Sequence, residues 1–474
     1  MKLIELKEPK LEFANGNTHI CPRHGIAEYS VFDANLETRP DKIVAGVVGT
    51  DDGIRKFQGF INWTQSAVPT ESSNNRLHPS FCGMSKLTGY RTQLTTGPDV
   101  HQIIPGSEIR IIKGVKRFTE RVASAVNLYL ERIDYICSYK RPDVVVCVLP
   151  EDLHEKIRHG LDDESSEDKL EAEYKTSTRH ANFRGMLKAR CLRYGVPIQI
   201  VRTESLLEEA SRMQIAATRA WNLCTALYFK SNISPPWKLS ADAPSYPTCY
   251  VGIAFFKSAD ASSIDASTAQ IFDELGKSVI LRGRPASVAK EDRAPYLQES
   301  DAFELLRDAL KTYRTAIRNT PSRLVIHKTS RFLPDEIAGF QAAADEDKID
   351  MLDLVSVTGT SMKIYRETLY PPLRGSMLQL SSNNAILYSR GSVPFFRTYP
   401  GPRVPQPLHI EIFSSDRSLE TVCQEVLGLT KMNWNNTQFD NKNPITLGCA
   451  RRVGEVIKYL GESEIPQPSY AYYM

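Results

Sequence analysis

The stretch KRFTERVASAVNLYLERIDYICSYKRPDVVVCVL, residues 116–149, decides the fold class of this chain. Up to Tyr139 its apolar residues recur every three or four positions, which predicts an amphipathic helix. From Asp143 the chain becomes a run of β-branched residues that Pro150 ends, and such a run predicts a strand buried on both faces. A helix followed directly by a buried strand is typical of proteins in which helices cover a parallel sheet.

The segments before this stretch supply its neighbours in the sheet. Residues 42–49, KIVAGVVG, predict a buried strand followed by a turn at residues 50–53, and residues 109–112 predict a second, short strand. A polar stretch that contains aromatic residues lies between them. Strand, helix and strand in this order indicate an α/β layer with crossover connections.

Further helices and strands follow. Residues 182–194 (NFRGMLKARCLRY) predict a helix that ends at Gly195, residues 198–201 a strand, and residues 218–230 a second helix. The polar, proline-containing residues 240–247 mark a domain boundary. Beyond it we expect strands at residues 248–256, 323–327, 354–358 and 385–389, and helices at residues 301–318 and 451–460.

Composition places the chain among ordinary globular proteins. Of its 474 residues, 41% are hydrophobic and 24% are charged, which excludes the disordered, collagen-like and coiled-coil classes. This length predicts two large lobes. Because the net charge is only +3, a nucleic-acid-binding surface would need a local concentration of cations.

Cysteine usage and the first residues predict a cytoplasmic protein. The nine cysteines are an odd number without a C-x-x-C pair, so we expect buried, reduced thiols. The N-terminus lacks the continuous apolar core of a signal peptide. The longest apolar runs are much shorter than the roughly 18 residues that span a bilayer, so we expect no membrane association.

The strongest charge feature is a reversal of sign along the chain. Residues 162–173 carry seven acids and one lysine, and residues 174–203 carry seven Lys or Arg and no acid. A solvated loop followed by a basic surface helix explains this pattern as well as a binding site does. The placement of the cations favours a site, because Arg184 and Lys188 are four residues apart and leave the predicted helix on one face. With Gln199 on the next strand, they predict an anion pocket.

Familiar catalytic and nucleotide-binding motifs are absent. Gly276-Lys277-Ser278 lacks the glycine that a phosphate-binding loop needs five residues upstream, where this chain has isoleucine. His154 and His159 are five residues apart, which separates the imidazoles by about 140° around a helix and does not suit shared zinc ligation. The chain also has neither a G-x-S-x-G elbow nor a G-x-G-x-x-G fingerprint.

Several stretches together resemble the Argonaute family, and specifically the short prokaryotic Argonautes that consist of a MID lobe and a PIWI lobe. NFRGMLKARC, GVPIQIV and NLCTALYFKSNISPPWKL are similar to the elements of the MID pocket that binds the 5′-phosphate of a guide strand. The resemblance implies an α/β protein with a Rossmann-like MID lobe plus an RNase H-like PIWI lobe. It places Arg184, Lys188, Gln199 and Lys230 in the pocket, with Arg184 where relatives often have Tyr or His.

The resemblance also implies a domain division. We expect residues 1–40 to form an N-terminal segment or linker, residues 41–243 the MID domain, and residues 244–474 an inactive PIWI domain. Residues 1–110 match the family weakly, and we expect them to add edge strands and a linker to both lobes. A length of 474 residues leaves no room for the N and PAZ lobes of long Argonautes, so a partner is expected to supply their equivalent.

The second lobe departs from cleaving relatives at their metal-binding positions. YVGIAF from residue 250, RLVIHKTS from residue 323 and PITLGCARR from residue 444 resemble the motifs that hold Asp or His there. Here the three places hold Ala254, Thr329 and Arg451. Two-metal cleavage needs several carboxylates around ions about 4 Å apart, so we expect no nuclease activity. Asp260 and Asp265 are the nearest acids, and we interpret them as part of a solvated loop.

A divalent ion is expected only because of the resemblance to this family. In prokaryotic relatives the C-terminal carboxylate folds back and helps Mg²⁺ to bind the guide 5′-phosphate, which gives Gln199 and Met474 that role here. The aromatic tail that ends in Met474 would serve equally well as packing against the body of the protein. No organic cofactor is expected.

The resemblance implies a recognition subunit rather than an enzyme. A small guide RNA would direct the protein to complementary single-stranded DNA of a phage or plasmid, with specificity from base pairing and protein contacts to the backbone and duplex shape. It further implies a heterodimer, open to higher oligomers on activation, with an APAZ-containing effector. A sirtuin-like NADase is favoured over a TIR NADase or a nuclease, and NAD depletion would produce abortive-infection immunity.

Two alternatives stay open. One is a self-sufficient guide-directed nuclease that uses displaced carboxylates, and the other is a guide-independent nucleic-acid-binding regulator. The nuclease would cut the target at a position set by the guide, and the regulator would bind 5′-phosphorylated and 5′-hydroxyl strands equally. The effector's identity, the guide and target chemistry and the preferred first base do not follow from the residues.

Overall fold

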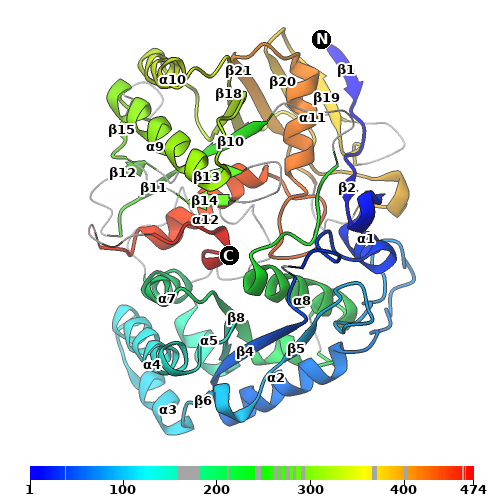
Figure 1. Cartoon of the computed structure of the whole chain (residues 1–474), viewed down its shortest axis with the longest axis vertical. Helices are drawn as coiled ribbons and strands as arrows, with labels where there is room; N and C mark the ends of the chain where they lie inside the picture. Colours follow the sequence, from blue (N-terminus) through cyan, green and yellow to red (C-terminus); the bar gives the residue numbers. More distant parts are fainter. Residues whose placement is uncertain are drawn as a thin grey trace.

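The helices and strands form two lobes, one above the other in Figure 1. This computed structural model describes all residues except 38, 159–180, 211–212, 241–246, 260–263, 267–269, 273–277, 281–283, 290–293, 366–370, 400–403, 462–463 and 465. The acidic residues 162–173 and the first part of the basic stretch, up to residue 180, therefore lie outside the described residues.

A five-stranded parallel sheet forms the centre of the lower lobe. β4 (Lys42–Gly49) pairs with β5 (Gln93–Thr95) and β6 (His101–Ile103) along one side and with β7 (Val144–Leu149) along the other, and β8 (Ile198–Arg202) follows β7. All six residues of β7 are buried, as the β-branched run predicts. β5 and β6 pair with successive parts of β4 and are joined by a short segment. The other connections between these parallel strands contain helices, which cover both faces of the sheet.

The helices of this lobe confirm three predictions, at α4 (Phe118–Tyr139), α7 (Phe183–Cys191) and α8 (Ala216–Asn232), and correct two others. The residues predicted as a strand at 109–112 lie in a helix, because Ile109 and Ile112 share its buried face while Ile111 points outward and is 71% exposed. The predicted turn at 50–53 is a helix start, where the Thr50 hydroxyl accepts a hydrogen bond from the Gly53 amide at 3.2 Å. The other helices are α2 (Asp51–Thr64), α3 (Gly106–Gly114) and α5 (Glu151–Ile157).

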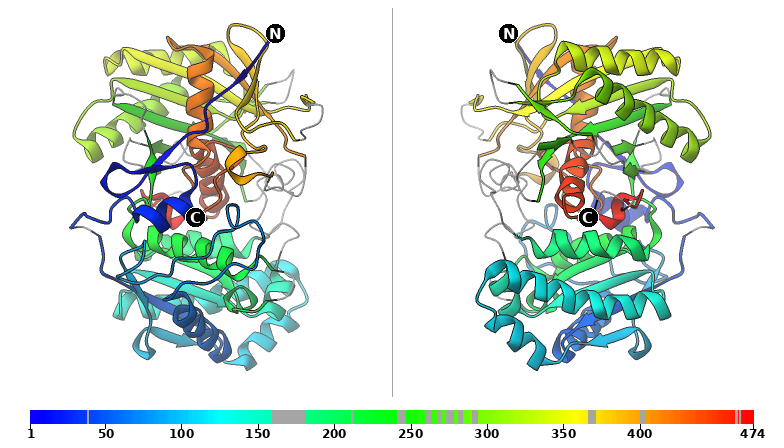
Figure 2. Two further views of the ribbon diagram at one scale, coloured as in Figure 1. Left: turned by 90° about the vertical axis from the view of Figure 1, so that its right-hand side faces the viewer. Right: turned by 90° about the vertical axis from the view of Figure 1, so that its left-hand side faces the viewer.

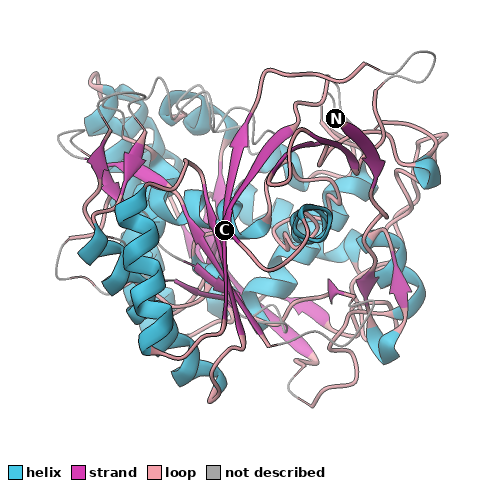
Figure 3. Ribbon diagram, turned by 90° about the horizontal axis from the view of Figure 1, so that it is seen from above, coloured by secondary structure: helices cyan, strands magenta, loops and turns pink. Residues whose placement is uncertain are grey.

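A nine-stranded sheet forms the centre of the upper lobe. Its three middle strands, β10 (Thr248–Ile253), β17 (Arg323–Lys328) and β18 (Met351–Gly359), are parallel, and the outer pairs are antiparallel. Figure 3 shows the strands between helices on either side. The outer strands are β1 (Lys2–Glu5), β13 (Gln270–Phe272), β14 (Ser278–Ile280), β19 (Ser376–Gln379), β20 (Asn384–Leu387) and β21 (Leu408–Ser414).

Alternating side chains of β10 face two different helix layers. Val251 and Ile253 belong to the core under α9 (Glu299–Ile317) and α10 (Pro334–Glu346). Gly252 faces the other way, where an added Cβ would lie 2.2 Å from the Thr446 carbonyl oxygen. Only glycine therefore allows the helix that carries Thr446 to pack this closely on the strand. That layer consists of α11 (Leu419–Leu429) and α12 (Ile445–Ile457).

Two expectations for the upper lobe need correction. The strand predicted at residues 248–256 is broken after Ile253, and β11 (Phe255–Lys257) pairs with β12 (Ile264–Ala266). Asp265 therefore lies in a strand opposite Phe256 rather than in a solvated loop, while Asp260 lies outside the described residues. The last helix begins at Ile445 instead of residue 451, because Pro444 has the extended conformation of a residue that precedes a helix.

The N-terminal residues connect the two lobes. β1 forms one edge of the nine-stranded sheet, as expected for residues that add edge strands. β2 (Leu11–Glu12) then pairs with β3 (Thr18–His19) and with β9 (Lys238–Leu239), which follows α8 of the lower lobe. α1 (Pro22–Tyr29) comes next, and the left view of Figure 2 shows this segment running between the lobes.

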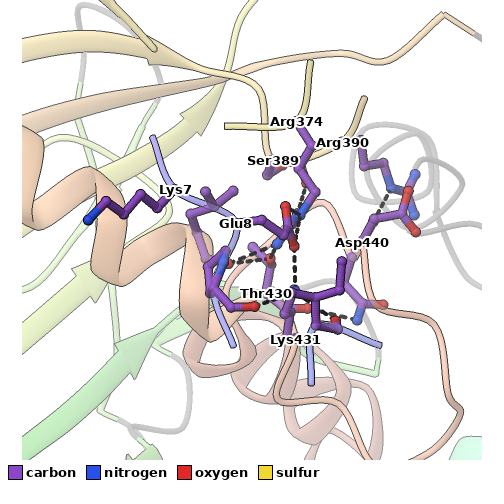
Figure 4. A network of polar contacts seen from close by, with 12 residues as sticks. Lys7, Glu8, Arg374, Ser389, Arg390, Thr430, Lys431 and Asp440 are labelled. Atoms are coloured by element: carbon purple, nitrogen blue, oxygen red, sulfur yellow. Dashed lines mark hydrogen bonds and ion pairs between the residues drawn. The ribbon is translucent and has the colours of Figure 1, made fainter. Parts of the chain in front are cut away.

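Between β1 and β2, two buried cations hold the Glu8 carboxylate. Arg374 Nε donates to both carboxylate oxygens at 3.1 and 3.2 Å, and Lys431 Nζ forms an ion pair with Oε1 (Figure 4). Lys431 also donates to the main-chain oxygens of Pro9 at 2.6 Å and Ile20 at 2.9 Å. Burial raises the pKa of Glu8, but Arg374 and Lys431 outweigh burial and hold it below its ordinary value.

We expect Glu8→Gln to lower the free energy of unfolding at pH 7 by about 2 kcal/mol, because Arg374 and Lys431 lose their shared counter-ion. Since the Glu8 pKa is lower in the folded protein, this contribution is present above pH 4.5 and is lost as the pH falls through the folded-state value. Urea unfolding of both proteins at pH 7 and at about pH 3 measures it. The difference should shrink in acid, and a difference that grows in acid contradicts the ion-pair account.

The cysteines lie where the sequence predicted them, inside the protein. All nine are free thiols, and eight are buried. No helix among the described residues is long and apolar enough to cross a membrane.

Candidate nucleic-acid interface

The packing of α7 brings the predicted anion-binding residues to the junction of the two lobes. The Asn182 side chain caps this helix by accepting from the Gly185 amide at 3.0 Å. A Cβ at Gly185 would lie 2.7 Å from the Glu455 carbonyl oxygen of α12. The missing side chain therefore lets α7 approach α12 closely, and Arg184 and Lys188 follow it to the junction.

Lys188 is buried beneath the C-terminal segment. Its Nζ donates to the main-chain oxygen of Met474 and, at 3.4 Å, to the carbonyl oxygen of Ile198, the first residue of β8. Met474 and Tyr473 are also buried, and the Tyr473 hydroxyl donates to the Gln467 carbonyl oxygen at 3.0 Å. The tail is therefore packed against the lower lobe at this lysine.

Gln199 and Lys230 meet beside the same strands. Lys230, in the last turn of α8, donates from Nζ to the side-chain oxygen of Gln199 on β8, and both residues are buried. Burial raises the pKa of the Cys147 thiol on β7 to about 12, and the positive charges of Lys188 and Lys230 oppose that rise. Both ammonium groups therefore lie near one thiol, and the two lysines and the amide form a buried cluster rich in positive charge.

Arg184 lies one helical turn before Lys188 and is near Tyr470 of the tail. Burial raises the pKa of the Tyr470 phenol, and the positive charges of Arg452 and Arg184 oppose that rise. Arg184 belongs to α7 of the lower lobe and Arg452 to α12 of the upper lobe. The structure thus brings Lys188, Gln199 and Lys230 together with the tail and places Arg184 beside them, near the ring of Tyr470.

A polar pocket next to Tyr470 is a feature that the sequence analysis missed. Asn441 Nδ2 donates to the Thr430 carbonyl oxygen at 2.9 Å, and Asn433 Nδ2 donates to the side-chain oxygen of Asn441 at 3.4 Å. Amide and guanidinium groups bind sugar hydroxyls and phosphate oxygens well. The available signal was the density of asparagine, five in residues 433–443. The lining residues are Thr430, Asn433, Asn441, Asn443, Ile445, Gly448, Arg452 and Tyr470.

Two of the three positions that the resemblance aligns with metal-binding residues, Ala254 and Thr329, directly follow the ends of the parallel strands β10 and β17. The Thr329 amide donates to the Ile253 carbonyl oxygen at 3.2 Å, which places Thr329 beside the buried Ala254. Arg451 lies on α12, about 140° around the helix from Thr446, which faces β10. The structure therefore brings Ala254 and Thr329 together and places Arg451 on the flank of the helix. No group of three or more His, Cys, Asp or Glu suited to a metal occurs among the described residues.

The residues expected to help bind Mg²⁺ are engaged with cations. The side-chain oxygen of Gln199 accepts from Lys230, and the main-chain oxygen of Met474 accepts from Lys188. Mg²⁺ requires several oxygen ligands in near-octahedral geometry, and two ammonium groups at the same place would repel it. The ion therefore stays a prediction of the resemblance, and the anchoring argument below rests on the lysines.

No protein-family model and no curated protein matches the sequence. Solved structures match nearly the whole chain, among them Clostridium butyricum Argonaute bound to a guide DNA and a 19-mer target DNA (TM-score 0.66, 15% identity, 98% of this chain and 53% of that chain). Drosophila Piwi (0.62, 13%, 99% and 56%) and Marinitoga piezophila Argonaute with a 5′ OH guide RNA (0.55, 14%, 100% and 59%) match similarly. The chain spans a little over half the length of these proteins. The predicted fold class is confirmed: the chain has an Argonaute-like α/β fold, with a Rossmann-like MID lobe and an RNase H-like PIWI lobe.

Proposed function

We propose that this protein anchors the 5′-phosphate of a small guide strand with Lys188, Gln199 and Lys230, aided by Arg184, and that the guide then holds a complementary strand. The convergence of two buried ammonium groups carries the proposal. A terminal phosphate carries nearly two negative charges, so it complements two ammonium groups that lie close together in the protein. Charge-assisted hydrogen bonds from both lysines would then fix the end of the strand.

The pocket favours a phosphate over a hydroxyl at the guide end. A 5′-hydroxyl carries no charge, so it cannot form the charge-assisted hydrogen bonds that a phosphate would form with Lys188 and Lys230. Of the neighbouring structures, Clostridium butyricum Argonaute is bound to a guide DNA and Marinitoga piezophila Argonaute to a 5′ OH guide RNA. For this chain we propose a small guide RNA and a single-stranded DNA target, which rests on the resemblance to short prokaryotic Argonautes.

We further propose that the PIWI lobe does not cut the target. Ala254, Thr329 and Arg451 offer no carboxylate for a pair of metal ions, and an arginine at such a place repels cations. The test is to incubate the protein with a 5′-phosphorylated guide, a labelled complementary strand and Mg²⁺ or Mn²⁺. The target should stay intact, and cleavage at a position set by the guide would establish the nuclease alternative.

A protein that recognises without cutting needs another activity to act on the result. We propose a heterodimer with an APAZ-containing effector, a sirtuin-like NADase in preference to a TIR NADase or a nuclease, which rests on the resemblance alone. Guide and target together should start NAD hydrolysis by the purified complex. An effector that is equally active without target would contradict this part of the proposal.

Chelation of divalent ions is expected to have little effect on the anchoring of the guide. Because the oxygens of Gln199 and Met474 are engaged by lysines, EDTA should change the dissociation constant for a 5′-phosphorylated guide by less than about threefold. Filter binding with and without EDTA at equal ionic strength measures this effect. A loss of more than tenfold would indicate that a divalent ion, and not the lysines alone, neutralises the phosphate.

A further inference from the structure

Four tyrosines, Tyr472, Tyr194, Tyr135 and Tyr139, form a row on the outer face of the MID lobe, which we call the tyrosine row. It begins at the C-terminal tail, where the Tyr472 hydroxyl donates to the Gly195 carbonyl oxygen at 3.0 Å. The Tyr194 hydroxyl donates to Asp134 of α4 at 2.6 Å, next to Tyr135. The rings of Tyr135 and Tyr139 are 5.0 Å apart. In the right view of Figure 2, α4 crosses the front of the lower lobe, with the C-terminal segment above it.

The row presents flat groups that are held in place. Tyr139 is 74% exposed and Tyr135 is 47% exposed. The Arg193 guanidinium lies 4.8 Å from the centre of the Tyr194 ring and donates to its hydroxyl at 2.6 Å, while the Arg193 side chain is 61% exposed. Exposed tyrosine rings and a stacked guanidinium are the surfaces on which unpaired bases stack.

The charges around the row favour an anionic ligand. Lys140 and Arg141 are exposed at the end of α4, next to Tyr139, and Arg193 is exposed beside Tyr194. The nearby acids are engaged by the protein: Glu131 pairs with Arg132 at 2.9 Å and Asp143 accepts from the Val44 amide at 2.7 Å. Asp134 accepts from Tyr194 and also pairs with Arg193 at 3.8 Å. Aromatic faces with cations beside them suit single-stranded nucleic acid.

We propose that the tyrosine row binds the single-stranded part of the target that extends 3′ beyond its pairing with the guide. This inference rests on the proposed function, because it takes the guide 5′ end to lie at Lys188 and Lys230. Paired strands are antiparallel, so the target leaves the duplex in its 3′ direction at the guide's 5′ end. The row starts at Tyr472, two residues before Met474, whose main-chain oxygen accepts from Lys188. From its 5′ end the guide extends in the opposite direction, along the duplex, so only the target continues past this point.

The test compares target strands on the guide-loaded protein. One target ends flush with the guide's 5′ end, a second carries six further unpaired nucleotides on its 3′ side, and a third carries them on its 5′ side. The 3′ extension should tighten binding about fivefold or more, because even one stacked base supplies that much affinity. The 5′ extension should not. Tyr135→Ala combined with Tyr139→Ala should remove the gain and leave the affinity for the flush target unchanged.

A matched control is Tyr365→Ala, which removes a tyrosine that is 78% exposed on the other lobe and should keep the full gain. Equal gains from the two extensions would overturn the proposal. A gain in affinity that survives the double substitution would overturn it too. If that variant also loses a co-purifying protein, the tyrosine row binds a protein partner instead. Flush-target binding that needs no guide would count against the proposed function instead.

Discussion

Replacing Lys188 and Lys230 together by methionine is expected to abolish the preference for a 5′-phosphorylated guide. Each lysine supplies a charge-assisted contact worth about 1.5–3 kcal/mol, so the two together change the dissociation constant roughly 100- to 10,000-fold. Methionine keeps most of the buried aliphatic volume while removing the charge. Filter binding of one guide sequence with a 5′-phosphate or a 5′-hydroxyl measures the loss directly.

The 5′-hydroxyl guide and a surface variant serve as controls for this experiment. The double variant should bind the 5′-hydroxyl guide as the unchanged protein does, because that guide has no charge at its end. Arg190→Met removes an exposed cation from the same helix, where Arg190 donates to Asn127 at 3.0 Å, and should leave the phosphate preference intact. If the double variant still prefers the phosphate, the pocket has been assigned to the wrong residues.

The second large effect is expected from the buried ion pair of Lys328 and Glu336. Both side chains are completely buried, and Glu336 also accepts from the amides of Leu297 and Leu333 at 2.9 Å each. Lys328→Met leaves this carboxylate buried without its cation, which should lower the free energy of unfolding by about 3–5 kcal/mol. Urea unfolding followed by circular dichroism measures the loss.

A surface pair in the same lobe provides the comparison. Arg331 forms an ion pair with Glu411 at 3.0 Å, but the Arg331 side chain is 66% exposed. Arg331→Met should therefore cost no more than about 1 kcal/mol, because solvent screens the charges. Equally small losses in Lys328→Met and Arg331→Met would mean that water reaches the buried pair and that the upper sheet does not depend on it.

Local patterns in the sequence predicted most of the fold. The β-branched runs at β4, β7 and β17 and the periodicity of α4 and α9 led to elements within a few residues of those observed. The prediction was wrong at α3 because Ile109, Ile111 and Ile112 read as a strand, and only the exposure of Ile111 reveals the helix. It missed the start of α2 because residues that cap a helix also form turns.

The candidate site was predictable where it is local. Arg184, Lys188 and Gln199 belong to one helix–turn–strand unit, so their spacing alone placed them near each other. The contact of Lys188 with Met474 joins residues 286 positions apart, and no periodicity predicts such a contact. The polar pocket likewise combines α12, the tail and the asparagine-rich segment 433–443, and it exists only after these segments pack together.

The central claim is that a guide with a 5′-phosphate lets this protein hold a complementary strand without cutting it. The most direct measurement follows one labelled target on native and denaturing gels, with Mg²⁺ present, after adding no guide, a 5′-hydroxyl guide or a 5′-phosphorylated guide. The account predicts strong retention with the phosphorylated guide only, and a target of full length on the denaturing gel. Retention that is equal in all three samples, or a product cut at a position set by the guide, would contradict it.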